Sequence, residues 1–134
     1  MTTAHQQQAS VMRRTDVPAV FEDWPGVRSR WITPPPSTGG WIGGLLAEWE
    51  LEGAGWADTH PHDEYAFVIE GELHVSCAGV EHVLGRGDTI CVPAGQTGRY
   101  WAPKYARMLG VWGPNPEGET TEHGECFSLE GMEP

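Results

Sequence analysis

Four side chains that can bind a metal ion or transfer a proton stand at alternate positions of one short segment: Asp58, His60, His62 and Glu64. Alternate residues of an extended strand lie on one face, with Cα atoms about 6.5–7 Å apart. Neighbouring members of the row can therefore reach the same ion, whereas all four, which span about 20 Å, cannot. The row predicts either a metal site or an acid–base pair.

Two sets of three ligands are compatible with this spacing. His60, His62 and Glu64 make a two-histidine, one-carboxylate set, which suits Fe, Mn, Ni or Zn and leaves coordination positions for water or substrate. Asp58 replaces His62 in the second set, because Pro61 interrupts the strand and can turn His62 away from the shared face. A further ligand can come from a neighbouring strand, and the candidates are His74, His82 and Tyr100.

A metal-free cavity is the alternative to a metal site. His60 and Glu64 would then form a hydrogen-bonded pair that binds a polar ligand and exchanges protons with it. Burial of Glu64 in an apolar barrel would raise its pKa, and a neighbouring imidazolium would lower that pKa again. With or without a metal, we predict that His60 and Glu64 are the catalytic residues.

The expected substrate-binding residues stand on segments predicted to line or rim the same cavity. Four of them are aromatic: Trp49, Trp56, Tyr100 and Trp101. Together they predict a cavity for a flat or hydrophobic small molecule. Arg99 stands beside them in the sequence and can bind a carboxylate or phosphate group through two parallel hydrogen bonds.

The charge and composition of the chain disfavour several classes of function. Eight basic residues stand against nineteen acidic ones, a net charge of −11, which disfavours binding to nucleic acids or to anionic membranes. The amino-terminal residues lack the apolar core of a secretory signal, and no run approaches the roughly 18 apolar residues of a membrane span. Three widely spaced cysteines make no disulfide framework. We therefore expect a soluble, cytoplasmic protein.

A chain of 134 residues predicts a single domain with one modest core. Short alternating or apolar segments, separated by turns rich in the 18 glycines and 11 prolines, predict an all-β sandwich or barrel. We assign residues 1–12 to a disordered arm, 13–113 to the barrel and 114–134 to an acidic tail that is mobile or loosely docked. Strands are expected at residues 17–21, 27–32, 45–51, 64–69, 73–77, 81–84, 89–92, 98–101 and 106–112.

Residues 40–113 resemble the cupin superfamily in the order and spacing of their motifs. Five positions carry the resemblance: Glu64 and Gly71 in the first motif, and Gly87, Pro93 and Gly95 in the second. The interval between the motifs is fifteen residues, as in compact cupins. The resemblance implies a double-stranded β-helix, which is a jelly-roll barrel, with a metal or small-molecule site inside it.

The resemblance also changes the expected ligand set. In the cupin register the two histidines of the first motif fall on Asp58 and His60, which implies a set of Asp58, His60 and Glu64. The second-motif histidine falls on Gly98 and the closing asparagine on Ala102, so two of the four usual ligands are absent. Three segments are similar to the cupins of ethanolamine-utilisation operons, which are likewise poor in these histidines: residues 63–73, 87–95 and 105–107.

We predict a small-molecule enzyme of the lyase, isomerase, cyclase or dioxygenase type that acts on a small organic acid or secondary metabolite. It would use one divalent metal ion, or the pair of His60 and Glu64 alone. The alternative is a non-catalytic cupin without metal that binds a ligand as a sensor or accessory protein. Residues 65–69 are apolar on both faces of their strand. This predicts a homodimer, because a second subunit would cover the outer face.

Overall fold

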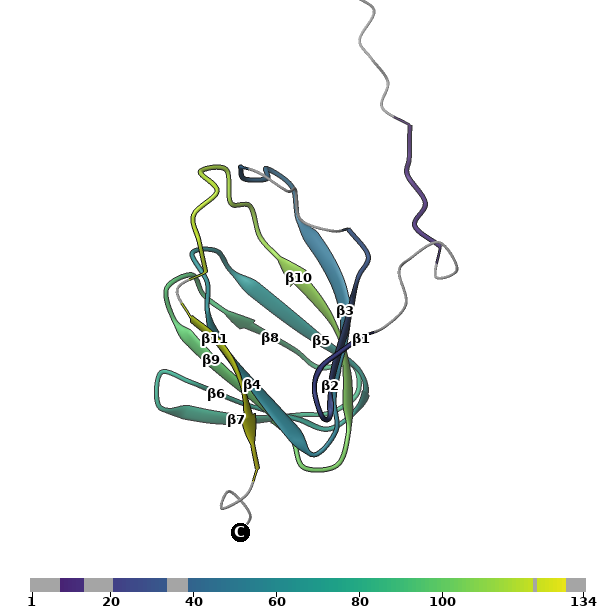
Figure 1. The fold of residues 1–134 in the computed structure, drawn as a ribbon, viewed down its shortest axis with the longest axis vertical. Coiled ribbons are helices and arrows are strands. Elements are labelled where there is room, and N and C mark those ends of the chain that lie inside the picture. The colour runs from purple at the N-terminus through teal and green to yellow at the C-terminus, as the bar shows by residue number, and fades with distance from the viewer. Residues whose placement is uncertain (1–7, 14–20, 34–38, 122, 130–134) are drawn as a thin grey trace, which may run out of the picture.

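The computed structural model describes residues 8–13, 21–33, 39–121 and 123–129. These residues form eleven strands and no helix (Figure 1). None of them therefore belongs to a helix long and apolar enough to cross a membrane. The strands are β1 (Phe21–Trp24), β2 (Val27–Trp31), β3 (Leu45–Leu51), β4 (Ala54–Thr59), β5 (Glu64–Gly71), β6 (Leu73–Cys77), β7 (Val80–Leu84), β8 (Thr89–Val92), β9 (Thr97–Ala102), β10 (Ala106–Trp112) and β11 (His123–Ser128).

The strands make two antiparallel sheets that face each other (Figure 1). One sheet has six strands in the order β1-β2-β3-β10-β5-β8, and the other has five in the order β11-β4-β9-β6-β7. The chain crosses between the sheets after β3, β4 and β5, and it crosses again after β7, β8, β9 and β10. Repeated crossing of this kind builds a jelly roll, so the predicted all-β barrel is confirmed.

Alternating side chains explain why β3 forms and which face it buries. Every second residue from Leu45 to Leu51 is buried, and the residues between them are partly exposed on the outer face. On that face Glu50 pairs with Arg28 of β2 at 2.8 Å, and Glu48 pairs with Arg30 at 3.1 Å. The Arg28–Glu50 pair is partly exposed and contributes at most about 1 kcal/mol, and Arg30 is buried beside Glu48. The buried apolar face supplies most of the stabilisation of β3.

The core lies between the two sheets and contains the carboxyl group of Glu64. Its largest fully buried members include Leu51, Leu73, Met108 and Tyr100. Glu64, at the start of β5, lies among them and is only 2% exposed. Burying a carboxyl group costs free energy unless a partner compensates it. The side chains around Glu64 must therefore include a hydrogen-bonding or charged partner for its carboxyl group.

Several predicted strands have the observed boundaries, and two strands, β4 and β11, are missing from the prediction. The predictions at 45–51, 73–77, 89–92 and 106–112 coincide with β3, β6, β8 and β10. Residues 53–55 have the composition of a turn, yet β4 begins inside this segment. Gly55 belongs to the strand because its missing side chain makes room for the ring of Phe127 in β11. Most of the strand predicted at 17–21, and most of the arm at 1–12, lies outside the described residues.

The carboxyl-terminal segment differs from the loose tail that its composition indicates. β11 pairs with β4 along its whole length, from His123 opposite Thr59 to Ser128 opposite Ala54. This pairing covers the backbone edge of β4 that faces away from β9, an edge that would otherwise be open to other chains. The segment is acidic and rich in glycine, which conceals the strand in the sequence.

Candidate functional site

Pro61 divides the row of alternating polar residues into two structural elements. Asp58 lies in β4, His60 lies in the connection that follows, and Glu64 is the first residue of β5. Because β4 and β5 belong to different sheets, the connection carries the chain across the barrel and returns the Glu64 carboxyl toward Asp58. A hydrogen bond of 2.8 Å from the Gly95 backbone N–H to the His60 carbonyl holds the connection in place.

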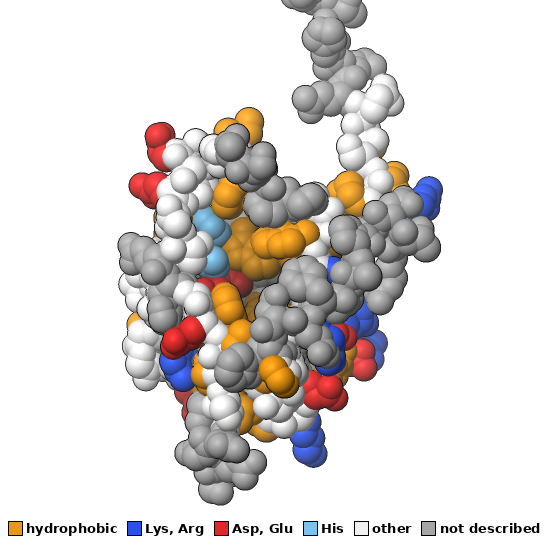
Figure 2. Space-filling view, viewed as in Figure 1, with side chains coloured by type: hydrophobic (Ala, Val, Ile, Leu, Met, Phe, Trp, Pro, Cys, Tyr) orange, Lys and Arg blue, Asp and Glu red, His pale blue; other side chains and the backbone are white. Residues whose placement is uncertain are grey.

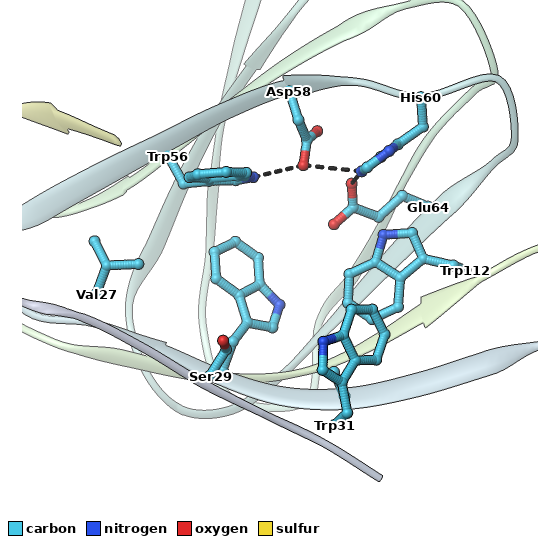
Figure 3. A pocket seen from close by; sticks show the side chains of 10 residues that line it. Val27, Ser29, Trp31, Trp56, Asp58, His60, Glu64 and Trp112 are labelled. Carbon is cyan, nitrogen blue, oxygen red and sulfur yellow. Dashed lines mark hydrogen bonds and ion pairs between the residues drawn. The ribbon is translucent and has the colours of Figure 1, made fainter. Parts of the chain in front are cut away.

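The three side chains meet at one point (Figure 3). His60 Nε2 lies 3.0 Å from Asp58 Oδ2 and 3.3 Å from Glu64 Oε1. Asp58 Oδ2 also accepts a hydrogen bond of 2.5 Å from Trp56 Nε1, and Thr121 Oγ1 lies 2.8 Å from the other ring nitrogen of His60. One donor atom from each of the three residues lies within 4.8 Å of the other two, which is close enough to share one ion.

Burial and the neighbouring charges shift both titrating groups. Burial alone would lower the pKa of His60, but hydrogen bonds and charge from Asp58 and Glu64 outweigh it and raise this pKa to about 9. Burial raises the pKa of Glu64 to about 7, although the hydrogen bond from His60 opposes the increase. Near neutral pH the site therefore holds an imidazolium beside a carboxyl group that can gain or lose a proton.

The cluster forms one end of a pocket of about 240 Å³. Figure 2 shows a hollow on this face of the molecule, with orange hydrophobic side chains and pale-blue histidine at its edge. A concave, mainly apolar space with a few convergent polar groups is the usual form of a small-molecule site. The remaining walls consist of Val27, Ser29, Trp31, Ala47, Trp49, Trp56 and Trp112.

The fold and this cluster can be placed in a known family. A family model described as Cupin domain matches residues 46–112, which is half of the chain. The chain belongs to the cupin family. The matched segment extends from β3 to the end of β10 and contains Asp58, His60 and Glu64. The resemblance to cupins that the sequence motifs predict is thereby confirmed.

Solved structures of other cupins have the same fold at low sequence identity. An RmlC-like cupin from Shewanella frigidimarina has a TM-score of 0.66 at 20% identity, covering 82% of this chain and 96% of its own. KdgF from a Halomonas species has a TM-score of 0.66 at 15% identity, covering 79% and 95%. The EutQ protein of Clostridium difficile has a TM-score of 0.56 at 23% identity, covering 66% and 68%. No curated protein sequence matches the chain.

The predicted ligand residues lie in different parts of this cupin. Asp58, His60 and Glu64, the set implied by the cupin register, are the three that the fold brings together. The His62 ring stacks on His60 with centroids 4.7 Å apart and meets Trp41 edge-on, and the described residues place none of its nitrogens in the cluster. The two other candidate histidines are on the far strands: His74 stacks on Trp101, and His82 is exposed on β7.

The predicted substrate-binding residues also separate into two groups. Trp49 and Trp56 line the pocket. Arg99 lies over the Phe127 ring, with its guanidinium carbon 4.2 Å from the ring centroid, and Trp101 stacks on His74. Neither is among the described residues that line the pocket. Tyr100 is fully buried and meets Trp49 edge-on at 5.3 Å between centroids, so it lies behind the pocket wall.

Trp31, Trp112 and Thr121 contribute to the site, although they are not among the site residues predicted from the sequence. Trp31 shares one face of β2 with Val27 and Ser29, because the three alternate along the strand, and all three line the pocket. That alternation is a signal that the sequence contains. Thr121 contacts His60 from sixty-one residues away, and no local pattern predicts such a contact.

Tyr100 occupies space next to the position where the cupin register expects a histidine. A Cβ atom at Gly98 would lie 2.9 Å from the Tyr100 hydroxyl and from its Cε1. Within the described residues the hydroxyl has no hydrogen-bond partner, and burial, with the charges of Glu64 and Asp58, raises the pKa of Tyr100 well above its ordinary value. A neutral phenol therefore takes the place of the missing imidazole side chain.

The pKa shifts predict that the metal-free protein loses stability as the pH rises. The folded-state pKa of His60 is about 9 against an ordinary 6.5, and that of Glu64 is about 7 against 4.5. Both groups bind protons more tightly in the folded state. The contribution of Glu64 is full below about pH 4.5 and is lost through about 7, and that of His60 is full below about pH 6.5 and is lost through about 9.

We expect the free energy of unfolding of the chelator-treated protein to fall by about 1–2 kcal/mol between about pH 6 and about pH 9.5. The full His60 shift would give about 3 kcal/mol, and partial access of water to the ring reduces it. Urea denaturation at the two pH values measures the change, and His60→Ala should flatten it. An unchanged pH dependence in His60→Ala would show that other groups cause the effect.

Proposed function

We propose that this cupin is an enzyme that acts on a small organic molecule and that Asp58, His60 and Glu64 hold one divalent metal ion, Fe, Mn, Ni or Zn. The observation that supports the proposal most directly is the convergence of these three donors at one end of a tryptophan-lined pocket. The ion would lie where a ligand in the pocket can reach it.

The chemistry and spacing of the donors fit such an ion. Two carboxylates and one imidazole form an oxygen- and nitrogen-rich set that first-row divalent metals accept. Donors at about 2.1 Å from one ion lie about 3 Å apart when they are neighbours in its coordination sphere. The distances of 3.0 and 3.3 Å from His60 Nε2 to the Asp58 and Glu64 oxygens agree with that separation.

The surrounding residues support the same interpretation. Glu64 Oε1 is buried, and its contact among the described residues is the 3.3 Å ion pair with His60 Nε2, which lacks the geometry of a hydrogen bond; an ion would compensate this oxygen more fully. Thr121 contacts Nδ1 of His60, which leaves Nε2 directed at the carboxylates, as a partner of a metal-binding histidine commonly does. A bound ion of this kind supplies Lewis acidity, or an activated water, to a substrate. The pocket walls would orient the substrate and exclude bulk water.

Acid–base catalysis without metal is the second candidate function. The observation that favours it is the hydrogen bond of 3.0 Å between His60 and Asp58, with Glu64 beside the same nitrogen. In this form Asp58 orients the imidazolium, and Glu64, with its pKa near 7, accepts or donates a proton at neutral pH. A non-catalytic cupin is the remaining alternative, and the absence of histidine at Gly98 and of asparagine at Ala102 is what favours it.

Elemental analysis tests the metal proposal directly. The chain should be purified without a histidine tag, loaded separately with Fe, Mn, Ni and Zn, and freed of loosely bound ions by gel filtration. We expect close to one ion per chain for at least one of these metals. If no ion is retained after any loading, the metal proposal is rejected. Acid–base catalysis without metal and non-catalytic ligand binding then remain as the candidate functions.

We also propose that the chain forms a homodimer through the outer face of β5. Tyr65 is 43% exposed and Phe67 is 40% exposed on this face, although both are large and apolar enough to be buried in most proteins. Adjacent exposed hydrophobic side chains of this size commonly mark an interaction surface. In a dimer with a twofold axis beside β5, the outer face of β5 in each chain would be covered by the same face of the other chain.

Phe67→Glu should convert this dimer into a monomer, because the charge would be desolvated at the interface. Analytical ultracentrifugation at micromolar concentration measures the mass. Val83→Glu is the matched control, since Val83 is 58% exposed on β7 of the other sheet and should leave the mass unchanged. A parent chain that sediments as a monomer would contradict the proposal.

A further inference from the structure

Four tryptophans from four strands surround the pocket, and we call them the tryptophan box: Trp31 of β2, Trp49 of β3, Trp56 of β4 and Trp112 of β10. Figure 3 shows the box together with Asp58, His60 and Glu64 at one side. Indole rings are large and rigid, so they offer extensive contact area at a low cost in conformational entropy. The question is which chemical class of ligand this arrangement recognises.

The indoles are held in place by specific contacts. Trp31 and Trp112 lie with ring centroids 5.0 Å apart and planes tilted by 48°. The Trp56 ring is fixed by its hydrogen bond to Asp58, and Figure 3 shows it edge-on, with one face toward the interior of the pocket. Gly110 makes room for Trp112, whose Cη2 atom would lie 2.6 Å from a Cβ at that position. These contacts fix the positions of Trp31, Trp56 and Trp112 within the barrel.

The charges around the box favour a cation. Whether the His60 imidazolium or a divalent ion lies between them, the carboxyl groups of Asp58 and Glu64 leave the polar end without net positive charge, and no lysine or arginine is among the described residues that line the pocket. The faces of indole rings are also electron-rich and attract cations. An anionic ligand would meet two carboxyl groups and these faces, and the described residues that line the pocket supply no lysine or arginine to pair with it. Arg99, the arginine that the sequence places near the site, lies over Phe127 instead.

We propose that the pocket binds a small organic cation, with a substituted ammonium group in the tryptophan box and the rest of the molecule directed at Asp58, His60 and Glu64. The volume of about 240 Å³ is below the usual range of about 300–1,000 Å³ for small-molecule pockets, which favours a compact ligand. The inference rests on the proposed function in treating this cluster as the reacting end. It narrows the expected substrates from organic acids and secondary metabolites to organic cations.

A pair of isosteric probes tests the charge preference. Choline and 3,3-dimethylbutan-1-ol have nearly the same shape, but only choline carries a positive charge. We expect isothermal titration calorimetry to give at least about tenfold tighter binding of choline, the preference that desolvated cation–π contacts typically supply. Equal affinities, tighter binding of the neutral alcohol, or no binding of either probe would overturn the proposal.

Variants of the box test whether the indole faces cause the preference. Trp31→Leu should weaken choline binding about tenfold and leave the neutral alcohol nearly unaffected, whereas Trp31→Phe, which keeps an aromatic face, should lose less. Trp101→Leu is the matched control, because Trp101 stacks on His74 outside the pocket. Circular dichroism identifies variants that do not fold. A choline preference that survives in folded Trp31→Leu and in the equivalent Trp112→Leu would overturn the proposal.

Each titration is repeated on metal-loaded and on chelator-treated protein, which separates this inference from the proposed metal site. A choline preference, together with no metal retained after loading with Fe, Mn, Ni or Zn, supports the cation pocket and rejects the metal site. A stoichiometric ion without any choline preference supports the metal site and rejects the cation pocket.

Discussion

The His60→Ala variant is expected to bind its divalent ion at least about 100-fold more weakly than the parent chain. Loss of a residue that only hydrogen-bonds to a metal ligand weakens metal binding by about 10–100-fold. His60 is itself a proposed metal ligand, and its Nε2 lies between the Asp58 and Glu64 oxygens, so its loss should cost at least as much. Its removal would also leave two carboxyl groups to repel each other in a buried site. Competition with a chromogenic chelator measures the affinity, and elemental analysis gives the number of ions per chain.

His62→Ala is the matched control for this experiment. The two rings stack with centroids 4.7 Å apart, so both variants remove an imidazole from the same place. Only His60 belongs to the three-donor cluster of the described residues, and the affinity of His62→Ala should therefore stay within a factor of about 10. Equal losses in the two variants would make His62 a ligand. Unchanged binding in His60→Ala would remove His60 from the metal site.

His60 belongs to the three-donor cluster and His62 does not, and this difference shows how much of the site could be predicted from the sequence alone. Spacing along a strand favours His60, His62 and Glu64, because it treats the segment as continuous. Pro61 ends that continuity, and Glu64 enters a different sheet from Asp58. The family register keeps Asp58 in the set, since motif order preserves information about three-dimensional position that spacing lacks. The three side chains that converge in the structure are therefore predicted better by the resemblance than by periodicity.

The fold could be predicted further than the site. β3 and β10 have clear alternation or apolar content, and their predicted boundaries match the observed ones. The strand β11 is hidden by its acidic, glycine-rich composition, because it is stabilised by the partner strand β4 rather than by its own pattern. Trp31 and Trp112 meet on one wall of the pocket because β2, β3 and β10 are neighbours in one sheet. Strand order of this kind is long-range information that no local window contains.

Gly98→Ala is expected to lower the free energy of unfolding by about 2–3 kcal/mol, the upper part of the range for overpacked cores. The added Cβ would lie 2.9 Å from the Tyr100 hydroxyl, and the ring has little space to move because Tyr100 is 0% exposed and packs edge-on against Trp49. Urea denaturation measures the loss as a lower midpoint at unchanged slope. Gly43→Ala is the matched control, since nothing lies within 4 Å of a Cβ at that position.

A double-mutant cycle shows whether Gly98 and Tyr100 act as a pair. If the clash with the ring is the cause, Gly98→Ala should cost less than about 1 kcal/mol in a Tyr100→Leu background, which gives a coupling energy in the range seen for residues in contact. An undiminished cost there would mean that residue 98 is constrained by the backbone. Coupling would instead mean that the residues at positions 98 and 100 depend on each other. Glycine, in place of the second-motif histidine, would then be needed at position 98 to make room for the buried Tyr100 ring beside Glu64. A histidine could then return to position 98 only together with a smaller residue at position 100.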